Sequence, residues 1–397
     1  MKLVKSLLLG SAAGLAAVAG AQAADLPVRK AAPVEYVRVC STYGAGFFYI
    51  PGTETCLRVG GRVRADYVYV EPEFRDDDAI GFRARGRIQL DARTATAYGL
   101  LRTFVRFEMT RDTGAFGFSS TSANVDQAFI QFGGLTAGRA LTFFDNGDID
   151  AQTFAGVRWN DQPNVNLLAY TFSFGNGFSA TLSLEEGEFT GIELPPAFTD
   201  VTAGQRIPDV VANVRYAGTW GSAQLSGALH QLRSVALTDA AGVGFIPDTE
   251  YGFAVSGQFN FNLPMLGAGD AVWLAATYAD GALGYLGFGG AEVADAVIDV
   301  DGDIDTTKGW SIAGGLRHYW TPEIRQNIFG SYAKVEYGAG LTGEDFNEWR
   351  VGTNVLWSPV SGLTLGAEVQ YQSTDFELAG VDNDDFWTAR LRVQRDF

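Results

Sequence analysis

Apolar and polar residues alternate along most of this chain with a period of two, the period of a β-strand. The clearest run spans residues 82–93, where Phe, Ala, Gly, Ile and Leu alternate with four arginines, Gln and Asp. Each run predicts a strand with one apolar face and one polar or charged face. We count sixteen such runs, centred near Val63, Ile88, Val105, Phe129, Gly138, Ala169, Thr181, Ala212, Leu225, Val255, Leu274, Ile312, Phe329, Val351, Ala367 and Leu391.

The connections between these runs alternate between short turns and long polar segments. Glycine-rich turns follow several strands, whereas residues 188–208, 234–249, 281–306 and 373–384 form long connections. A soluble β-sandwich also alternates apolar and polar residues, but it has no reason to order its connections in this way. The pattern and the even number of strands predict an all-β fold, a transmembrane antiparallel β-barrel of about 16 strands.

Charge on the polar faces is concentrated in the first strands and the last. Arginine on the lipid face at mid-membrane costs about 2–4 kcal/mol, so we expect these faces to line a water-filled interior. A merely solvated interior, with the arginines paired to Asp66, Asp91 and Glu108, is the alternative. The arginines are Arg58, Arg62, Arg64, Arg83, Arg85, Arg87, Arg102 and Arg106, joined by Arg390 and Arg392 if the last strand closes on the first.

Residues 144–163, FDNGDIDAQTFAGVRWNDQP, break the alternation between the fifth and sixth strands. A connection of about twenty residues is usually functional or disordered. We expect this third external loop to fold into the lumen; the alternative is a mobile surface loop. The expected pore constriction then consists of Asp145, Asp148 and Asp150 facing Arg58, Arg62, Arg83, Arg85 and Arg102. Because acidic residues outnumber basic ones and the external loops are acidic, cations should be enriched at the mouth, while the arginine wall opposes this inside; we therefore expect a weak cation preference.

The N-terminus predicts export. Lys2 and Lys5 precede an apolar stretch that ends near an Ala-x-Ala cleavage pattern at residues 21–23, so residues 1–23 are expected to be a signal peptide. Residues 24–54 are then an N-terminal periplasmic arm with a cysteine-bracketed segment, and residues 55–397 the barrel. Small residues on the outward faces of the first strands suggest close subunit contacts; they include Ala65, Ala84, Gly86 and Ala92.

Cys40 and Cys56 are the two cysteines of the sequence. An even pair in an exported chain predicts one disulfide, and the Gly and Pro-Gly signals between them allow the chain to fold back. Two cysteines cannot form a tetrahedral metal site, and no histidine lies near them. We therefore expect a Cys40–Cys56 disulfide and no metal.

Net charge and motifs exclude several classes of function. Of 29 basic residues two lie in the signal peptide, which leaves 27 against 46 acidic residues and a net charge of −19. Such a chain is not expected to bind nucleic acid. No catalytic triad or phosphate-binding glycine motif stands out, so neither an enzyme nor a cofactor is expected. The acidic stretch 295–305 lacks the glycine and final glutamate of a helical calcium loop, so cation binding there is left open.

Four stretches resemble the general porins of alphaproteobacteria: VCSTYGAGFFYIPGTETCLRVGGRVR, DQAFIQFGGLTAGRALTFFD, LLAYTFSFGNGFSATLSLEEG and the terminal LRVQRDF. The resemblance spans the chain after the signal peptide and is weakest in the loops. It implies a homotrimeric diffusion channel for small hydrophilic solutes and ions in the bacterial outer membrane, surrounded by lipid and lipopolysaccharide. A substrate-specific channel or a barrel-borne enzyme is the alternative.

Overall fold

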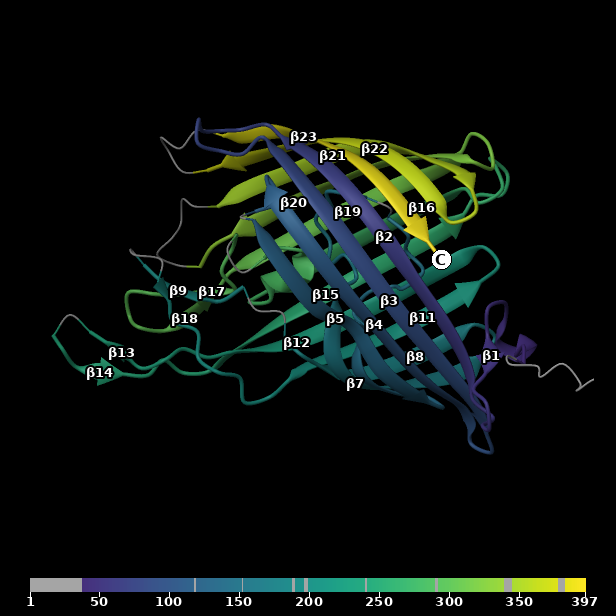
Figure 1. The fold of residues 1–397 in the computed structure, drawn as a ribbon. Helices are drawn as coiled ribbons and strands as arrows, with labels where there is room; N and C mark the ends of the chain where they lie inside the picture. The colour runs from purple at the N-terminus through teal and green to yellow at the C-terminus, as the bar shows by residue number, and fades with distance from the viewer. Residues whose placement is uncertain are drawn as a thin grey trace, which may run out of the picture.

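Sixteen long strands form one closed antiparallel barrel, shown in Figure 1. The structure, a computed structural model, describes residues 38–397 except 118, 152, 188–189, 196–198, 240, 290–291, 339–344 and 378–382. The expected signal peptide lies outside the described residues. The barrel strands are β2 (Cys56–Val70), β3 (Ile80–Thr96), β4 (Gly99–Gly114), β5 (Ser120–Phe132), β6 (Leu135–Leu141), β7 (Asn164–Gly175), β8 (Phe178–Glu185), β11 (Asp209–Gly218), β12 (Gly221–Leu232), β15 (Glu250–Asn262), β16 (Ala271–Asp280), β19 (Lys308–Tyr319), β20 (Ile324–Glu336), β21 (Phe346–Val360), β22 (Leu363–Phe376) and β23 (Asp384–Asp396).

The last strand closes the barrel on the first. β23 pairs with β2 in a register that runs from Arg62–Asp396 to Val70–Thr388. The terminal Phe397 exchanges two backbone hydrogen bonds with Gly61, of 2.9 and 3.0 Å. Its ring occupies the space beside Gly61, where an added Cβ would lie 2.4 Å from the ring. The terminal Phe397 therefore stabilises the pairing of β23 with β2.

Burial is inverted relative to a water-soluble protein. Val63, Ile88 and Leu391 are each 58% exposed, whereas Asp66 and Asp91 are 1% exposed. Alternating side chains of a strand point to opposite faces, so the apolar face covers the outside of the barrel and the polar face its inside. This distribution confirms the predicted transmembrane barrel, because only a lipid environment stabilises such an outer surface.

The long connections emerge together at one end of the barrel, as Figure 1 shows. They carry β9 (Ile192–Leu194), β10 (Thr199–Asp200), β17 (Ala296–Ile298) and β18 (Ile304–Thr306), which form a separate four-stranded sheet. β13 (Leu237–Thr238) and β14 (Gly244–Phe245) form a small hairpin. The described residues contain the 3₁₀ helices η1 (Ser41–Tyr43) and η2 (Leu283–Leu286), and no helix long and apolar enough to cross a membrane.

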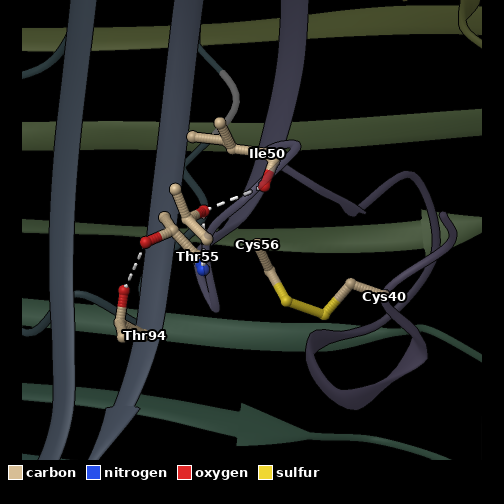
Figure 2. The surroundings of a disulfide bond; sticks show 6 residues. Cys40, Ile50, Thr55, Cys56 and Thr94 are labelled. Carbon is tan, nitrogen blue, oxygen red and sulfur yellow. Dashed lines mark hydrogen bonds between the residues drawn. A yellow bond between two sulfur atoms is a disulfide. The ribbon is translucent and has the colours of Figure 1, made fainter. Parts of the chain in front are cut away.

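The predicted disulfide is confirmed. Cys40 and Cys56 are bonded, with their Cα atoms 6.0 Å apart, and Cys56 is the first residue of β2. The chain between them folds back so that β1 (Phe48–Tyr49) pairs with the start of β2. Figure 2 shows how Thr55 continues this attachment to the next strand through a 2.9 Å hydrogen bond to Thr94. We call residues 40–56 the disulfide unit; it lies at the barrel end opposite the long connections (Figure 1).

Candidate functional site

The first residues of the connection between β6 and β7, residues 142–163, contact Glu185 of β8 and then β11, β12 and β15. The carbonyl oxygen of Phe143 accepts hydrogen bonds from Asn213 at 2.6 Å and from Gln224 at 3.2 Å. The backbone N–H of Asn146 donates to the Gln258 side chain at 2.6 Å. These partners lie on the polar, inward faces of their strands. The backbone groups of this irregular stretch are thus satisfied by side chains of the wall.

The middle of the same segment contacts β22 and β23. Glu368 of β22 accepts hydrogen bonds from the backbone N–H groups of Phe154 and Ala155, both at 2.7 Å. Arg390 of β23 donates to the carbonyl oxygen of Phe154. On the shorter path around the ring, five strands lie between β6 and β22, namely β5, β4, β3, β2 and β23, so the segment contacts distant parts of the barrel wall.

Arg158 anchors the segment most heavily. Its guanidinium donates to both carboxylate oxygens of Glu348 on β21, at 2.7 and 2.8 Å. It also donates to the Gly287 carbonyl at 2.7 Å and to Glu292 at 2.8 Å. Burial opposes the charge of Arg158, but the two glutamates outweigh it and raise the pKa of Arg158 above its ordinary value. The side chain therefore stays charged and joins the segment to the wall and to a second connection.

That second connection, residues 281–307, is a part of the site that the sequence reasoning missed. Tyr285 and its neighbours in η2 are almost fully buried, and the Tyr285 ring lies 4.5 Å from that of Phe144. Farther along the first segment, Trp159 is 1% exposed and lies 5.3 Å from Trp273 of β16. Burying a side chain of this size stabilises by roughly 1.5–3 kcal/mol or more. Two packed apolar clusters thus attach both connections to one side of the barrel.

A cavity of about 500 Å³ lies against the first strands. Arg58, Arg102 and Arg106 line it together with Asp145 and residues of β5 and β6. Phe104 and Phe129 stack at 5.3 Å in its wall. Two of the predicted arginines and one of the predicted acids therefore border the same space.

The five predicted arginines form ion pairs with acids of their own wall. Arg58 and Arg102 approach Asp91 at 3.8 and 2.9 Å. The remaining pairs are Arg62–Asp396 at 2.6 Å, Arg83–Asp112 at 2.7 Å and Arg85–Glu108 at 3.6 Å. The wall is thus neutralised in part by its own carboxylates.

The three predicted acids differ in their surroundings. Asp148 pairs with Arg215, and Asp150 pairs with Arg317 at 2.8 Å and approaches Arg325 at 3.9 Å. Asp145 is 3% exposed and accepts hydrogen bonds from Gln258 and from the Gln162 N–H, each at 2.8 Å.

Burial raises the pKa of Asp145 to about 7, although the hydrogen bonds from Gln258 and Gln162 act in the opposite direction. Asp145 is therefore only partly charged near neutral pH.

Arg215, Arg317 and Arg325 were absent from the predicted constriction. Each stands singly on its strand, without the neighbouring arginines that marked the first strands. Arg215 could have been found from its place on the polar face of β11. The other two flank a short turn, and their approach to Asp150 depends on how the segment folds.

No group of three or more His, Cys, Asp or Glu side chains within the described residues is arranged to hold a metal ion. In the acidic stretch, Asp299 instead accepts backbone hydrogen bonds from Asp301 and Asp303, both at 2.9 Å. These bonds close a turn of the chain.

A closed sixteen-stranded barrel with an apolar outer surface and a charged cavity defines the class of outer-membrane channels. Comparison with known proteins identifies the family within this class. A family model described as "Porin subfamily" matches residues 25–393. Porin Omp2b of Brucella suis is 33% identical over 427 residues, covering 99% of this chain and 100% of that protein. Porin Omp2b of Brucella canis is also 33% identical, over 417 residues and 99% of each chain. The chain belongs to this porin family and is an outer-membrane porin.

Solved structures share the fold. The outer membrane channel DcaP of Acinetobacter baumannii has a TM-score of 0.70 at 17% identity, covering 88% of this chain and 99% of that one. The trimer form of OmpT from Vibrio cholerae has a TM-score of 0.54 at 12% identity, covering 87% and 100%. An anion-selective porin from Comamonas acidovorans has a TM-score of 0.51 at 13% identity, covering 87% and 100%.

Proposed function

We propose that the protein is a water-filled passive diffusion channel for small hydrophilic solutes and ions, and that residues 142–163 form its constriction within the lumen. The observation that carries the proposal is the set of hydrogen bonds from this segment to inward-facing side chains of distant strands. Gln258 and Glu368 accept backbone N–H groups of the segment from two separate parts of the wall. A segment bonded in this way crosses the interior of the barrel.

The position of the segment leaves the passage beside the arginine-rich strands. Its apolar residues pack on β16, β19 and β20, where Trp159 and Ile149 join Trp273 and Phe329 in one cluster. The cavity lies against β2 to β8 and reaches β11 and β12. Solutes would pass between the segment and the wall that carries Arg58, Arg62, Arg83, Arg85 and Arg102.

Opposite charges on the two sides of this passage would create a transverse electric field. Field lines concentrate in a narrow aqueous passage with low-dielectric walls, so the field selects solutes by sign and polarity. The pairing of Asp148 and Asp150 with nearby arginines reduces their contribution without removing it, since both carboxylates remain partly exposed. With a net charge of −19 without the expected signal peptide, we propose a weak cation preference that decreases as salt screens the field.

We also propose that three barrels associate through the first strands. Ala65 lies beside Ala84 in the register of β2 and β3, and Val63 lies beside Gly86. The small outward side chains leave room for a neighbouring subunit in the lipid. The trimer form of the similar OmpT structure supports the same assembly for this chain.

The test is the reversal potential in a planar bilayer under a salt gradient, comparing the parent with a double variant, Asp148→Asn and Asp150→Asn. Removing two negative charges beside the passage should shift the permeability ratio toward anions. The matched control, Asp301→Asn with Asp303→Asn, removes the same charge from an exposed stretch of the connection between β16 and β19. Equal shifts in both double variants would contradict the constriction, and a protein without channel activity would contradict the whole proposal.

A further inference from the structure

The disulfide unit presents an aromatic ring to two arginines on the inward faces of β2 and β3. Phe47 is 2% exposed. The guanidinium carbon of Arg58 lies 5.1 Å from the centre of its ring, and that of Arg93 lies 5.0 Å from it. Both distances fall within the range of cation–π attraction. The unit therefore contacts the same wall that borders the cavity.

These arginines belong to a cluster with excess positive charge. Arg93 and Arg102 donate to both oxygens of Asp91, at distances from 2.8 to 3.1 Å. Arg58 approaches the same carboxylate at 3.8 Å. The single carboxylate of Asp91, whose side chain is 2% exposed, thus forms ion pairs with three guanidinium groups. Their mutual repulsion would drive the outermost of them, Arg58, away from the others.

The ring of Phe47 attracts the arginines whose positive charge the single carboxylate of Asp91 does not fully balance. The negative face of an aromatic ring attracts a cation without adding a formal charge. Tyr43 adds a second ring, 5.7 Å from Arg93 and edge-to-face with Phe47 at 6.0 Å. Arg58 is also confined sterically, since its Cδ lies 3.5 Å from the place of a Cβ on Gly46. The arginines are therefore bounded by Asp91 on one side and by the unit on the other.

The ring of Phe47 is fixed relative to β2. The Cys40 N–H donates to the Phe47 carbonyl at 2.9 Å, and Cys40 is bonded to Cys56 at the start of the strand. β1 pairs with β2 directly after Phe47, through Phe48 and Leu57. Figure 2 shows the disulfide bond and the turn it closes beside the first two strands. A short, doubly attached loop of this kind keeps the ring in one place.

We propose that the disulfide unit is a positioning element of the channel, in which Phe47 holds Arg58 and Arg93 around Asp91 and thereby sets the charge selectivity of the adjoining cavity. Phe47 acts through Arg58, which lines that cavity, whereas the ring itself is buried. The inference rests on the proposed channel function. It assigns the unit a role in permeation in addition to its attachment to β2.

The test is the reversal potential of Phe47→Leu, which keeps an apolar side chain but removes the ring. Cation–π contacts at partly exposed sites correspond to roughly two- to fivefold changes in the population of the held orientation. Arg58 then spends less time at the cavity wall, so the permeability ratio should shift toward cations. Tyr49→Leu is the matched control, since the Tyr49 ring faces Arg38 at 4.4 Å, outside the cluster around Asp91.

A double-mutant comparison separates positioning from general damage. Arg58→Gln alone should shift selectivity in the same direction, and Phe47→Leu should add little once Arg58 is absent, because residues acting through one contact are not additive. Phe47→Tyr should keep the parental selectivity, since it retains an aromatic ring at this position. Heat-modifiable migration in gel electrophoresis shows that each variant has a folded barrel.

Three outcomes would overturn the inference: unchanged selectivity in folded Phe47→Leu, an equal shift in Tyr49→Leu, or full additivity with Arg58→Gln. If Phe47→Leu does not fold, the milder variant Phe47→Met takes its place with the same expected shift. Absence of any channel in the parent would reject the proposed function, which this comparison distinguishes from failure of the positioning role.

Discussion

Replacing Arg158 with Gln removes the strongest single attachment of residues 142–163. The parent side chain makes four hydrogen bonds of 2.7–2.8 Å, three of them to carboxylate oxygens. Gln cannot form the two-pronged contact with Glu348, and it carries no charge to balance that residue, which is 3% exposed. The variant should therefore detach the segment from β21 more often than the parent does.

The size of the effect follows from the partners that remain. Breaking a buried ion pair by removing one partner costs about 3–5 kcal/mol. Glu348 keeps Arg350, which donates to it at 2.8 Å, so the loss is smaller. We expect about 2–3 kcal/mol, or roughly a 30- to 150-fold larger population of the detached segment, at 1.4 kcal/mol for each factor of ten.

Single-channel recording is the assay. The Arg158→Gln channel should show more frequent open-channel fluctuations, including steps above the parental conductance, because the detached segment obstructs the passage less. Arg139→Gln is the control, since Arg139 forms a solvent-accessible 3.5 Å pair with Glu186, and such pairs contribute little. Parental conductance and noise in a folded Arg158→Gln channel would show that Arg158 does not hold the segment in the passage.

Two further predictions concern acidity and assembly. Burial raises the pKa of Asp145 to about 7, above the unfolded value near 3.9, so its stabilising contribution is complete below about pH 4 and is lost as pH rises to about 7. Thermal unfolding in detergent should thus show a fall in Tm from pH 4 to pH 8 that is smaller in Asp145→Asn; an identical fall would show that Asp145 is not responsible. Gly86→Trp should convert trimers to monomers in native mass measurements, because a Cβ there meets no atom of its own barrel within 4 Å; an intact trimer would place the interface elsewhere.

The barrel could be predicted from the sequence because its governing pattern is local. Each of the sixteen predicted strand centres lies within an observed barrel strand, from Val63 in β2 to Leu391 in β23. Alternation decides which face a residue occupies, and a membrane leaves little choice of which face points outward. The disulfide could be predicted equally well, since two cysteines in an exported chain allow one intramolecular pair.

The partners of the candidate site could not be predicted in the same way. Asp148 and Arg215 are 67 residues apart, and their pairing depends on the irregular path of a connection with no repeating pattern. Tyr285 resembles any loop aromatic in the sequence, yet it packs on Phe144. Periodicity therefore indicates which arginines face inward, whereas ion pairing to the segment is decided by tertiary packing.

The central claim is that solutes pass between residues 142–163 and the first strands, beside the cavity. Gln89 lines that cavity on the inward face of β3, and Ile88 lies next to it on the outward face. Both native cysteines are in the disulfide, so a new cysteine is the only free thiol among the described residues. The decisive measurement is the single-channel current of Gln89→Cys and Ile88→Cys before and after labelling with a bulky, charged methanethiosulfonate. We expect a reduced current after labelling of Gln89→Cys and no change after labelling of Ile88→Cys. An unchanged current in Gln89→Cys channels that mass spectrometry shows to be labelled would mean that solutes do not pass beside the cavity.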